Sequence, residues 1–353
     1  MTIMGAQHID EAVSLTTKAL RAVADRDWAV PADGLDWSCY DTAVHVACDF
    51  TAYAGQLTAR ASEAWVPFEI AADPGTTPAG LIQSIEATGG ILSAVVATSA
   101  PDVRAWHPYG AAGAEDFAAM GVVEAFVHTH DMLRGLGVTD WEPSVELCAA
   151  VLDRLFPHAP RVNSPWPTLL WATGRGELPG LPRLSAWRWH TAPIRTERLV
   201  LCEIAPVTGA DLHAGGTGGF AWAEDGPYEG TRMAAGMVAR AHEAGTRRPG
   251  WGAYAIVRAA DATAVGGIGF HAAPDGDGNA EIGYDLVPSA RGNGYATEAV
   301  RALAAWALAQ PGLTTLHATV DDDNLASHAV VGRAGFTKSG AGEGDVRYTR
   351  TAV

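Results

Sequence analysis

The spacing of apolar residues changes near residue 190, from a helical period to strands that alternate with helices. Before this point, residues 8–26 repeat apolar side chains on one helical face: Ile9, Ala12, Val13, Leu20 and Val23. After the Pro- and Trp-rich segment LPGLPRLSAWRWHTAP, the run IRTERLVLCEI has the composition of a β-strand. A domain takes about 100–200 residues. The 353 residues therefore suffice for two, and we expect one domain over 1–190 and a second over 191–353.

The first half predicts helices joined by loops. We expect them over residues 8–26, 39–61, 78–98 and 115–135, with a fifth at about 143–155. Gly135 and Gly137 are suitable stop residues for the fourth helix. Helices of this length predict an antiparallel four-helix bundle.

The second half predicts a mixed α/β sheet. The expected strands are Leu199–Ile204, Trp251–Arg258, Ala264–Phe270, Ala280–Val287 and Thr315–Asp321. Helical patterns occupy residues 231–244, 296–309 and 325–334. The predicted fold class is therefore α plus α/β, a helical bundle followed by a mixed sheet with one open strand-to-helix junction.

The charge of the chain limits its partners. Lys and Arg number 24 and Asp and Glu number 40, which gives a net charge of −16. This excess repels phosphate, so nucleic acid is not an expected partner. A cationic small molecule would be attracted, although solubility alone explains the same excess.

The cysteines and the hydropathy pattern predict a cytoplasmic protein. The four cysteines Cys39, Cys48, Cys148 and Cys202 form no CxxC pair, which argues against a disulfide framework. The start MTIMGAQHIDEAV lacks the basic and apolar regions of a signal peptide. The chain has no run of about 18 consecutive apolar residues. We therefore expect no membrane partner.

A glycine-rich turn joins a strand directly to a helix in AEIGYDLVPSARGNGYATEAVRALAAWAL, residues 280–308. Glycines allow a tight turn that brings backbone N–H groups toward an anion, and the helix N-terminus adds unpaired N–H groups. The turn is not a Walker loop, which needs Gly-Lys-Ser/Thr, and not a dinucleotide G-x-G-x-x-G motif. It predicts a phosphate-binding turn of another kind.

The pattern Arg-x-x-Gly-x-Ala in this turn resembles the pyrophosphate loop of the GNAT superfamily of N-acetyltransferases. Further segments match the family in the same order: TERLVL at 196–201, VGGIGF at 265–270, Asn324 with Ser327, and RAGF at 333–336. The likeness to this RimJ/RimL-like type of domain extends over nearly all of residues 191–353.

The resemblance implies that acetyl-CoA is the acetyl donor. It assigns the pyrophosphate to the turn formed by Arg291, Gly292, Asn293, Gly294, Tyr295 and Ala296. Leu286 and Val287 would pair with the pantetheine arm as an added strand does, and Asn324 would hydrogen-bond the same arm. The reaction would be attack of a primary amine on the thioester.

That reaction needs a base for the amine and a donor for the leaving thiolate. Glu281 lies where some members of the family carry a catalytic glutamate, although a structural ion pair is an alternative role. Ser327 is the candidate for contact with the sulfur, or equally a cap of the next helix. His271 and Tyr284 are the alternative catalytic residues.

Residues 208–250 lie where the family varies and binds its acceptor. They contain carboxylates beside aromatic side chains, from which we select Trp222, Glu224, Asp225, Tyr228 and Glu229, close to Phe220. Such a set suits a cationic amine, although a solvated acidic loop explains it too. The predicted activity is an N-acetyltransferase acting on a primary amine of a small polar metabolite. An aminoglycoside-type antibiotic such as kasugamycin is the first acceptor to test, with resistance by acetylation as the consequence.

Three residues of the first half have the spacing of a metal site. Glu124 and His128 are four apart, so they share one face of a helix, and His45 lies on an earlier apolar helix. Two nitrogens and one carboxylate suit zinc, with iron or nickel as alternatives. Asp131 could support His128, whereas His130 should point elsewhere. A buried histidine with ordinary hydrogen bonds is the simpler explanation.

The first half resembles the DinB-like, mycothiol-dependent maleylpyruvate isomerase family in DWSCYDTAVHVACDFTAYAGQL, EAFVHTHDML and LLWATGRGELPGLPRLSAWRW. The resemblance implies a divalent metal on His45, Glu124 and His128, and a thiol cofactor activated there. Thr129 and His130, between His128 and Asp131, depart from the usual pair. An alternative function is therefore a mycothiol-dependent isomerase or S-transferase with an auxiliary acetyltransferase domain. A third is a bundle that forms a homodimer or covers the substrate, without chemistry of its own.

Overall fold

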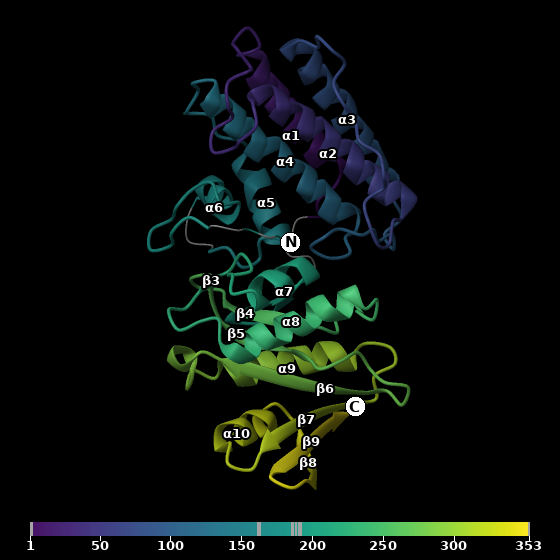
Figure 1. The fold of residues 1–353 in the computed structure, drawn as a ribbon, viewed down its shortest axis with the longest axis vertical. Helices are drawn as coiled ribbons and strands as arrows, with labels where there is room; N and C mark the ends of the chain where they lie inside the picture. Colours follow the sequence, from purple (N-terminus) through teal and green to yellow (C-terminus); the bar gives the residue numbers. More distant parts are fainter. Residues whose placement is uncertain (1–2, 161–163, 185–186, 188, 190–192, 352–353) are drawn as a thin grey trace. The chain divides into compact units, whose positions relative to one another are not determined.

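The computed structural model describes residues 3–160, 164–184, 187, 189 and 193–351. The chain divides into two compact units. The first unit comprises the described residues up to 156 and those within 163–183. The second comprises the described residues within 157–162 and those from 184 onward. The first unit is helical and the second contains the sheet (Figure 1). The predicted fold class is thus confirmed. The boundary expected between residues 190 and 191 lies outside the described residues.

The first unit is built on four long helices, α1 (Ala6–Arg21), α2 (Cys39–Ala59), α3 (Pro78–Thr98) and α4 (Ala114–Gly135). Helices α1 and α2 each pack against both α3 and α4. The two shorter helices α5 (Val145–Leu155) and α6 (Pro165–Ala172) follow, with α5 against α4. Helix α4 is buried on nearly all sides, which brings Glu124 and His128 into the interior.

Local capping explains where these helices begin. The Ser38 hydroxyl accepts a hydrogen bond from the Asp41 N–H at 3.1 Å at the start of α2, and Thr77 caps α3 in the same way. Pro78 then occupies the first turn of α3, where its missing N–H costs nothing. Helix α1 ends at Arg21, earlier than the predicted residue 26, because residues 22–26 form turns.

Helix α3 has the length and apolar composition of a membrane span, with a mean hydropathy of 1.4. Among the described helices it alone meets these two conditions. The same composition is found in a core helix of a bundle, and α3 packs against α1, α2 and α4 through residues such as Leu81, Ile85 and Leu92.

The second unit contains one mixed sheet in the order β1-β2-β4-β5-β6-β7-β9-β8, with β3 paired beside β5. Its strands are β1 (Ile194–Arg195), β2 (Leu199–Glu203), β3 (Ala221–Trp222), β4 (Ala253–Arg258), β5 (Thr263–Phe270), β6 (Asn279–Leu286), β7 (Thr315–Asp321), β8 (Thr337–Ala341) and β9 (Asp345–Thr351). The helices are α7 (Pro206–His213), α8 (Glu229–Glu243), α9 (Tyr295–Leu308) and α10 (Leu325–Arg333), with a 3₁₀ turn η1 (Pro288–Ala290). The β8–β9 hairpin, β1, β3 and α7 were not predicted.

The sheet opens between β6 and β7. These two strands run parallel but pair only from Asn279 to Glu281, opposite Thr315 to His317. Beyond Glu281, β6 stays paired with β5 up to Leu286, and β7 stays paired with β9 up to Asp321. The facing edges of β6 and β7 therefore keep backbone groups that no strand of the described residues uses.

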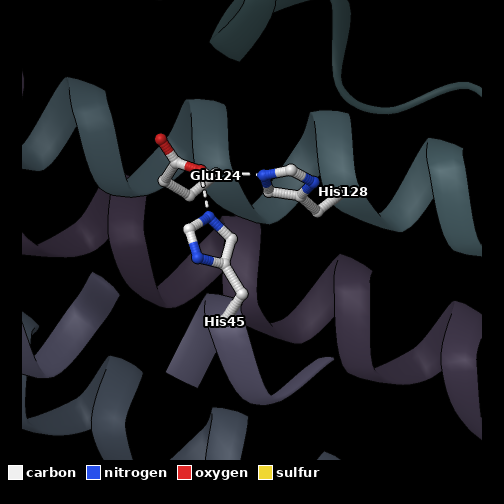
Figure 2. A group of neighbouring side chains, drawn as sticks. All are labelled: His45, Glu124 and His128. Carbon is white, nitrogen blue, oxygen red and sulfur yellow. Dashed lines mark ion pairs between the residues drawn. The ribbon is translucent and has the colours of Figure 1, made fainter. Parts of the chain in front are cut away.

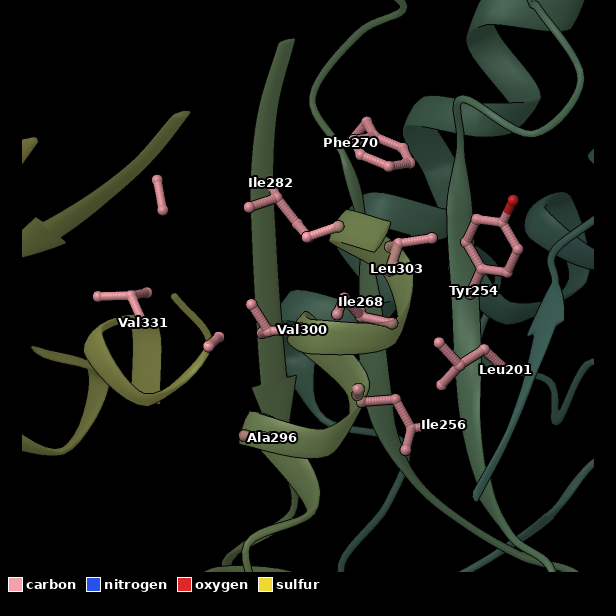
Figure 3. Close-up of a cluster of buried hydrophobic side chains, with 14 of the residues drawn as sticks. Leu201, Tyr254, Ile256, Ile268, Phe270, Ile282, Ala296, Val300, Leu303 and Val331 are labelled. Carbon is pink, nitrogen blue, oxygen red and sulfur yellow. The ribbon is translucent and has the colours of Figure 1, made fainter. Parts of the chain in front are cut away.

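The core of this unit fixes α9 against the sheet. Figure 3 shows Val300 and Leu303 of α9 near Ile268 and Ile282 of the strands. All four side chains are buried, so the helix cannot rotate without exposing apolar surface. Its N-terminus is thereby held at the end of β6.

Candidate functional site

The turn between β6 and α9 leaves backbone amides available to a ligand. Gly292 and Gly294 have φ angles of +78° and +80°, in the left-handed region that favours glycine. Gly294 is also the N-cap of α9, and no side chain of the described residues caps this helix. The first N–H groups of α9 are thus free to bind an anion such as a pyrophosphate.

Arg198 holds this turn in place and was missed by the sequence analysis. Its Nη1 donates to the Asn293 carbonyl at 3.0 Å, and its guanidinium lies 5.0 Å from the centre of the Tyr295 ring. It also pairs with Glu298 at 2.6 Å. Burial opposes ionisation of Glu298, but hydrogen bonds from Thr196 and Arg198 outweigh it and lower the pKa of that carboxyl. The arginine adds positive charge beside the predicted phosphate position.

Leu286 and Val287 differ in whether their backbone N–H and carbonyl groups face the open slot, the gap between β6 and β7 beyond Glu281. The Val287 N–H donates to Val265 and its carbonyl accepts from Ala290, both at 3.0 Å. Successive residues of a strand turn their backbone groups to opposite edges, so the Leu286 groups face the slot. Its carbonyl accepts from Arg291 Nε at 3.1 Å. Pairing with a pantetheine arm therefore remains a prediction. The backbone groups favour Leu286 for this pairing over Val287, whose N–H and carbonyl are both bonded.

Glu281 and His271 lie at the point where β6 and β7 separate. Glu281 is the last residue of β6 paired with β7, and its carboxylate is 3.4 Å from His271 Nδ1. Both side chains are partly exposed. The pair combines a carboxylate with an imidazole, which together can accept and relay a proton.

Tyr284 and Ser327 form a second candidate pair. The Tyr284 hydroxyl is buried, and no described residue lies in hydrogen-bonding geometry with it. Burial raises its pKa, and the neighbouring Ser327 hydroxyl offsets part of the rise. Asn324 caps α10, because its Oδ1 accepts the Ser327 N–H at 3.0 Å. The cap is therefore Asn324, and the Ser327 hydroxyl is not needed for it.

The residues predicted to bind the acceptor lie in different surroundings. Asp225 accepts from the N–H and the hydroxyl of Ser289, at 2.9 and 2.7 Å, and these bonds lower its pKa. Tyr228 lies 5.4 Å below the Arg291 guanidinium. Asp225 and Tyr228 thus adjoin the β6–α9 turn.

The other predicted acceptor residues differ again. Trp222 is half-buried, packs against a buried cluster and donates from Nε1 to the Thr217 carbonyl at 2.8 Å. Glu224 and Glu229 are exposed.

A cavity of about 850 Å³ lies between α8 and strands β4, β5 and β6. Its lining includes Met237, Trp251 and Phe270, together with Gly267, Gly269 and Gly283 of the strands. A Cβ on Gly267 would lie 2.6 Å from the Thr231 hydroxyl, so glycine allows α8 to approach the sheet. His271 also lines the cavity, and its Nδ1 lies 3.4 Å from the Glu281 carboxylate. A volume of this size suits a small-molecule substrate.

In the first unit, His45, Glu124 and His128 converge (Figure 2). One ligand atom from each lies within 4.8 Å of the other two. The Glu124 carboxylate is 3.1 Å from His128 Nε2 and 3.8 Å from His45 Nε2. Glu124 and His128 are buried, whereas the His45 side chain is 30 % exposed, which leaves one side accessible. Two nitrogens and one oxygen are donors of the types that zinc binds, and three protein donors leave one position of a tetrahedral site for a further ligand.

Asp131 and Arg175 orient His128 from its Nδ1 side, opposite the Nε2 atom that faces Glu124. Asp131 Oδ2 is 3.2 Å from His128 Nδ1, and Arg175 binds the same carboxylate from Nε and Nη2 at 2.9 and 2.8 Å. Burial opposes the charged imidazole, but hydrogen bonds to Asp131 and Glu124 raise the pKa of His128 to about 9. Asp131 thus lies where the sequence predicted a supporting residue, and Arg175 was missed because it is 44 residues further on.

Asp49 and Tyr53 also adjoin this cluster and were not predicted. Asp49 Oδ2 is 3.3 Å from His45 Nε2, and burial, followed by repulsion from Glu124, raises its pKa to about 7. The Tyr53 hydroxyl donates to Glu124 at 3.2 Å. Both lie on α2 one and two turns after His45, a spacing that could have indicated them. His130 is outside the cluster and contacts the Trp166 ring.

Two family models match the chain. Residues 9–133 match the mycothiol maleylpyruvate isomerase N-terminal domain, and residues 220–337 match an acetyltransferase (GNAT) domain. The first match contains His45, Glu124 and His128, and the second contains the β6–α9 turn. Both predicted resemblances are therefore confirmed.

Curated relatives align with part of the chain. The chain is 37 % identical over 76 residues to the uncharacterized N-acetyltransferase YoaA of Bacillus subtilis, which is 22 % of this chain and 43 % of the relative. It is 36 % identical over 87 residues to YjdG of the same organism, which is 25 % of this chain and 52 % of the relative. The chain thus spans about half the length of the curated relatives it matches.

Solved acetyltransferase structures align with a similar share of the chain. An acetyltransferase from Agrobacterium tumefaciens is 27 % identical, with a TM-score of 0.32, and covers 47 % of this chain and 98 % of its own. The ribosomal L7/L12 alpha-N-protein acetyltransferase RimL, in complex with coenzyme A, is 21 % identical with a TM-score of 0.34, over 45 % and 97 % of the two chains.

Proposed function

We propose that this chain, which carries a mycothiol maleylpyruvate isomerase N-terminal domain followed by a GNAT acetyltransferase domain, transfers acetyl from acetyl-CoA to a primary amine of a small polar metabolite. The observation that carries the proposal is the uncapped N-terminus of α9 beside the open edges of β6 and β7. The amides of residues 293–296 bind the pyrophosphate, and the β6 edge pairs with the pantetheine arm.

The transfer joins the amine nitrogen to the acetyl carbon and breaks the carbon–sulfur bond. Glu281 accepts the proton that the amine loses, either directly or through His271, 3.4 Å away. Ser327 or Tyr284 donates a proton to the leaving sulfur, so that coenzyme A departs as the thiol. The raised pKa of Tyr284 keeps its hydroxyl protonated at neutral pH, as a donor requires.

Replacement of Glu281 tests this mechanism. Glu281→Gln should lower kcat by about 100-fold or more, since a positioned base contributes about 10²–10⁴-fold, while the Kd for acetyl-CoA stays unchanged. Glu343→Gln, in the exposed β8–β9 turn, is the matched control and should keep full activity. An unchanged kcat and pH–rate profile for Glu281→Gln would show that Glu281 is not the base. Absence of acetyl-CoA binding to the wild-type chain would end the proposal.

The acceptor suggested by residues 208–250 is an aminoglycoside-type antibiotic, with kasugamycin first, and antibiotic resistance would follow from its acetylation. The exposed carboxylates of Glu224 and Glu229 support this candidate. Asp225 supports it less, because Ser289 already bonds both of its oxygens. Thiol release during incubation with amine antibiotics and polyamines, with and without a chelator, tests the acceptor. A homodimer and a cytoplasmic location remain part of the proposal.

A second function belongs to the first unit, where His45, Glu124 and His128 would hold a divalent metal, with zinc the best fit to the donors. A bound zinc ion would supply a Lewis acid able to keep a thiol ionised. Asp131 and Arg175 would fix the His128 ring with Nε2 toward the ion. The alternative activity, a mycothiol-dependent isomerase or S-transferase, would be recognised by turnover of a maleylpyruvate-like or thiol substrate.

A further inference from the structure

The cavity beneath α8 differs in charge from the chain as a whole. The chain carries a net charge of −16, but three arginines line the cavity, Arg240, Arg247 and Arg248. The carboxylate in its lining is Asp285. A cavity that concentrates cations in an acidic protein attracts an anionic ligand.

Asp285 contributes one negative charge against the three arginines of the lining, and its oxygens already accept hydrogen bonds. They accept from the Thr231 N–H at 2.6 Å, the Thr231 hydroxyl at 2.5 Å and the Gly267 N–H at 2.9 Å. These bonds join the start of α8 to β5 and β6. Asp285 therefore has a structural role, because three of the roughly four acceptor positions of its carboxylate are used in these bonds.

The arginines, in contrast, retain free donors. Arg247 pairs with Glu203 at 2.8 Å, but its buried Nε has no hydrogen-bond partner among the described residues. Arg240 and Arg248 are exposed and make no ion pair within the described part of the chain. Guanidinium groups bind carboxylate and phosphate through paired N–H donors. Arg240 and Arg248, which no carboxylate of the described residues pairs, would therefore repel a polycationic acceptor.

The cavity also adjoins the proposed base. His271 lines one part of it and lies 3.4 Å from the Glu281 carboxylate, while the arginines come from the end of α8 and the segment after it. A substrate in the cavity can thus present an amine to Glu281 and another group to the arginines.

We infer that the acceptor is a primary amine that also carries an oxyanion, either carboxylate or phosphate, and that Arg240, Arg247 and Arg248 bind this oxyanion while the amine reaches Glu281. The inference rests on the proposed acetyl transfer and deepens it. Within the proposed class of small polar amines, it favours anionic amines over the polycationic aminoglycosides suggested by residues 208–250.

The test compares amines that differ in one anionic group, with the full-length chain and acetyl-CoA. The pairs are glucosamine 6-phosphate with glucosamine, O-phosphoethanolamine with ethanolamine, and an α-amino acid with its carboxamide. The anionic member of at least one pair should have a kcat/KM about 10-fold higher or more, as expected for a charge-assisted hydrogen bond. The phosphate and carboxylate pairs distinguish the two kinds of oxyanion.

Variants assign the preference to the cavity. Arg240→Gln and Arg248→Gln should each reduce the ratio within the preferred pair and leave the Kd for acetyl-CoA unchanged. Arg258→Gln is the matched control, because Arg258 pairs with Asp261 and does not line the cavity. Binding of each amine to the protein saturated with coenzyme A, measured by calorimetry, gives a second readout independent of turnover.

Three results would overturn the inference: equal or better use of the neutral members, equal or absent binding of both members, or a preference that survives both arginine variants. In these cases intact acetyl-CoA binding leaves the proposed acetyl transfer standing. Loss of acetyl-CoA binding to the wild-type chain would instead refute the proposed function itself.

Discussion

The two candidate sites of this chain are built from different parts of the polypeptide. The turn at the start of α9 offers backbone amides from consecutive residues, is exposed and needs glycine at two positions. The cluster of His45, Glu124 and His128 offers side chains from two helices, most of it buried. The first depends on local backbone conformation, whereas the second depends on how helices α2 and α4 pack.

This difference determines what supports each site. The α9 turn needs the buried residues of α9 and the Arg198–Glu298 pair to hold it against the sheet. The metal cluster needs a chain of hydrogen bonds, from Arg175 through Asp131 to His128, to fix one ring. Substitutions should therefore affect one site without changing the other.

The largest expected effect is on the metal cluster. The wild-type chain should hold about one zinc ion, whereas His45→Ala and Glu124→Gln should lower zinc affinity by more than about 100-fold, beyond what loss of a supporting residue costs. Metal analysis of the purified protein measures this. His130→Ala is the matched control, because His130 lies two residues from His128 but outside the cluster. A metal-free wild type, or equal zinc loss in the control, contradicts the site.

The second effect concerns the turn. Gly294→Val should weaken acetyl-CoA binding by about 10- to 100-fold, since a branched residue in the left-handed region costs about 1–2 kcal/mol and displaces the amides. Calorimetry gives the Kd, and zinc content should stay unchanged. Gly344→Val imposes the same strain at φ +93° with open space around it, so it serves as the control. Equal affinities in Gly294→Val and the wild type would mean that the pyrophosphate binds elsewhere.

The smallest effect concerns the support of His128. Arg175→Gln should weaken zinc binding by about 10-fold, as replacement of partners behind a metal ligand does, and leave acetyl-CoA binding intact. Competition with a chromogenic chelator measures the affinity. Arg183→Gln removes a nearby arginine that bonds the Gly174 carbonyl, and it should have no effect. If both variants bind zinc as the wild type does, Arg175 only stabilises the fold.

Features formed by consecutive residues could be predicted from the sequence, whereas contacts between distant residues could not. The β6–α9 turn was predicted because its residues are consecutive and its glycines mark the backbone conformation. Asp225 and Tyr228 were selected by composition, but contacts with Ser289 and Arg291 bring them to the turn. Arg198 and Arg175 act on residues 95 and 44 positions away, so no local pattern reveals them. The β8–β9 hairpin was missed because its first strand is exposed and lacks alternating apolar residues.

The amino-acid sequence alone was sufficient for the helical and mixed classes of the two halves, the glycine turn and the spacing of Glu124 and His128. These features depend on the period of apolar residues and on local backbone freedom, both of which act over a few positions. The folded chain alone decided which edge of β6 stays open, that the arginines line one cavity, and which carboxylates are already bonded. Those outcomes depend on residues far apart in the sequence, and packing alone brings such residues within hydrogen-bond distance.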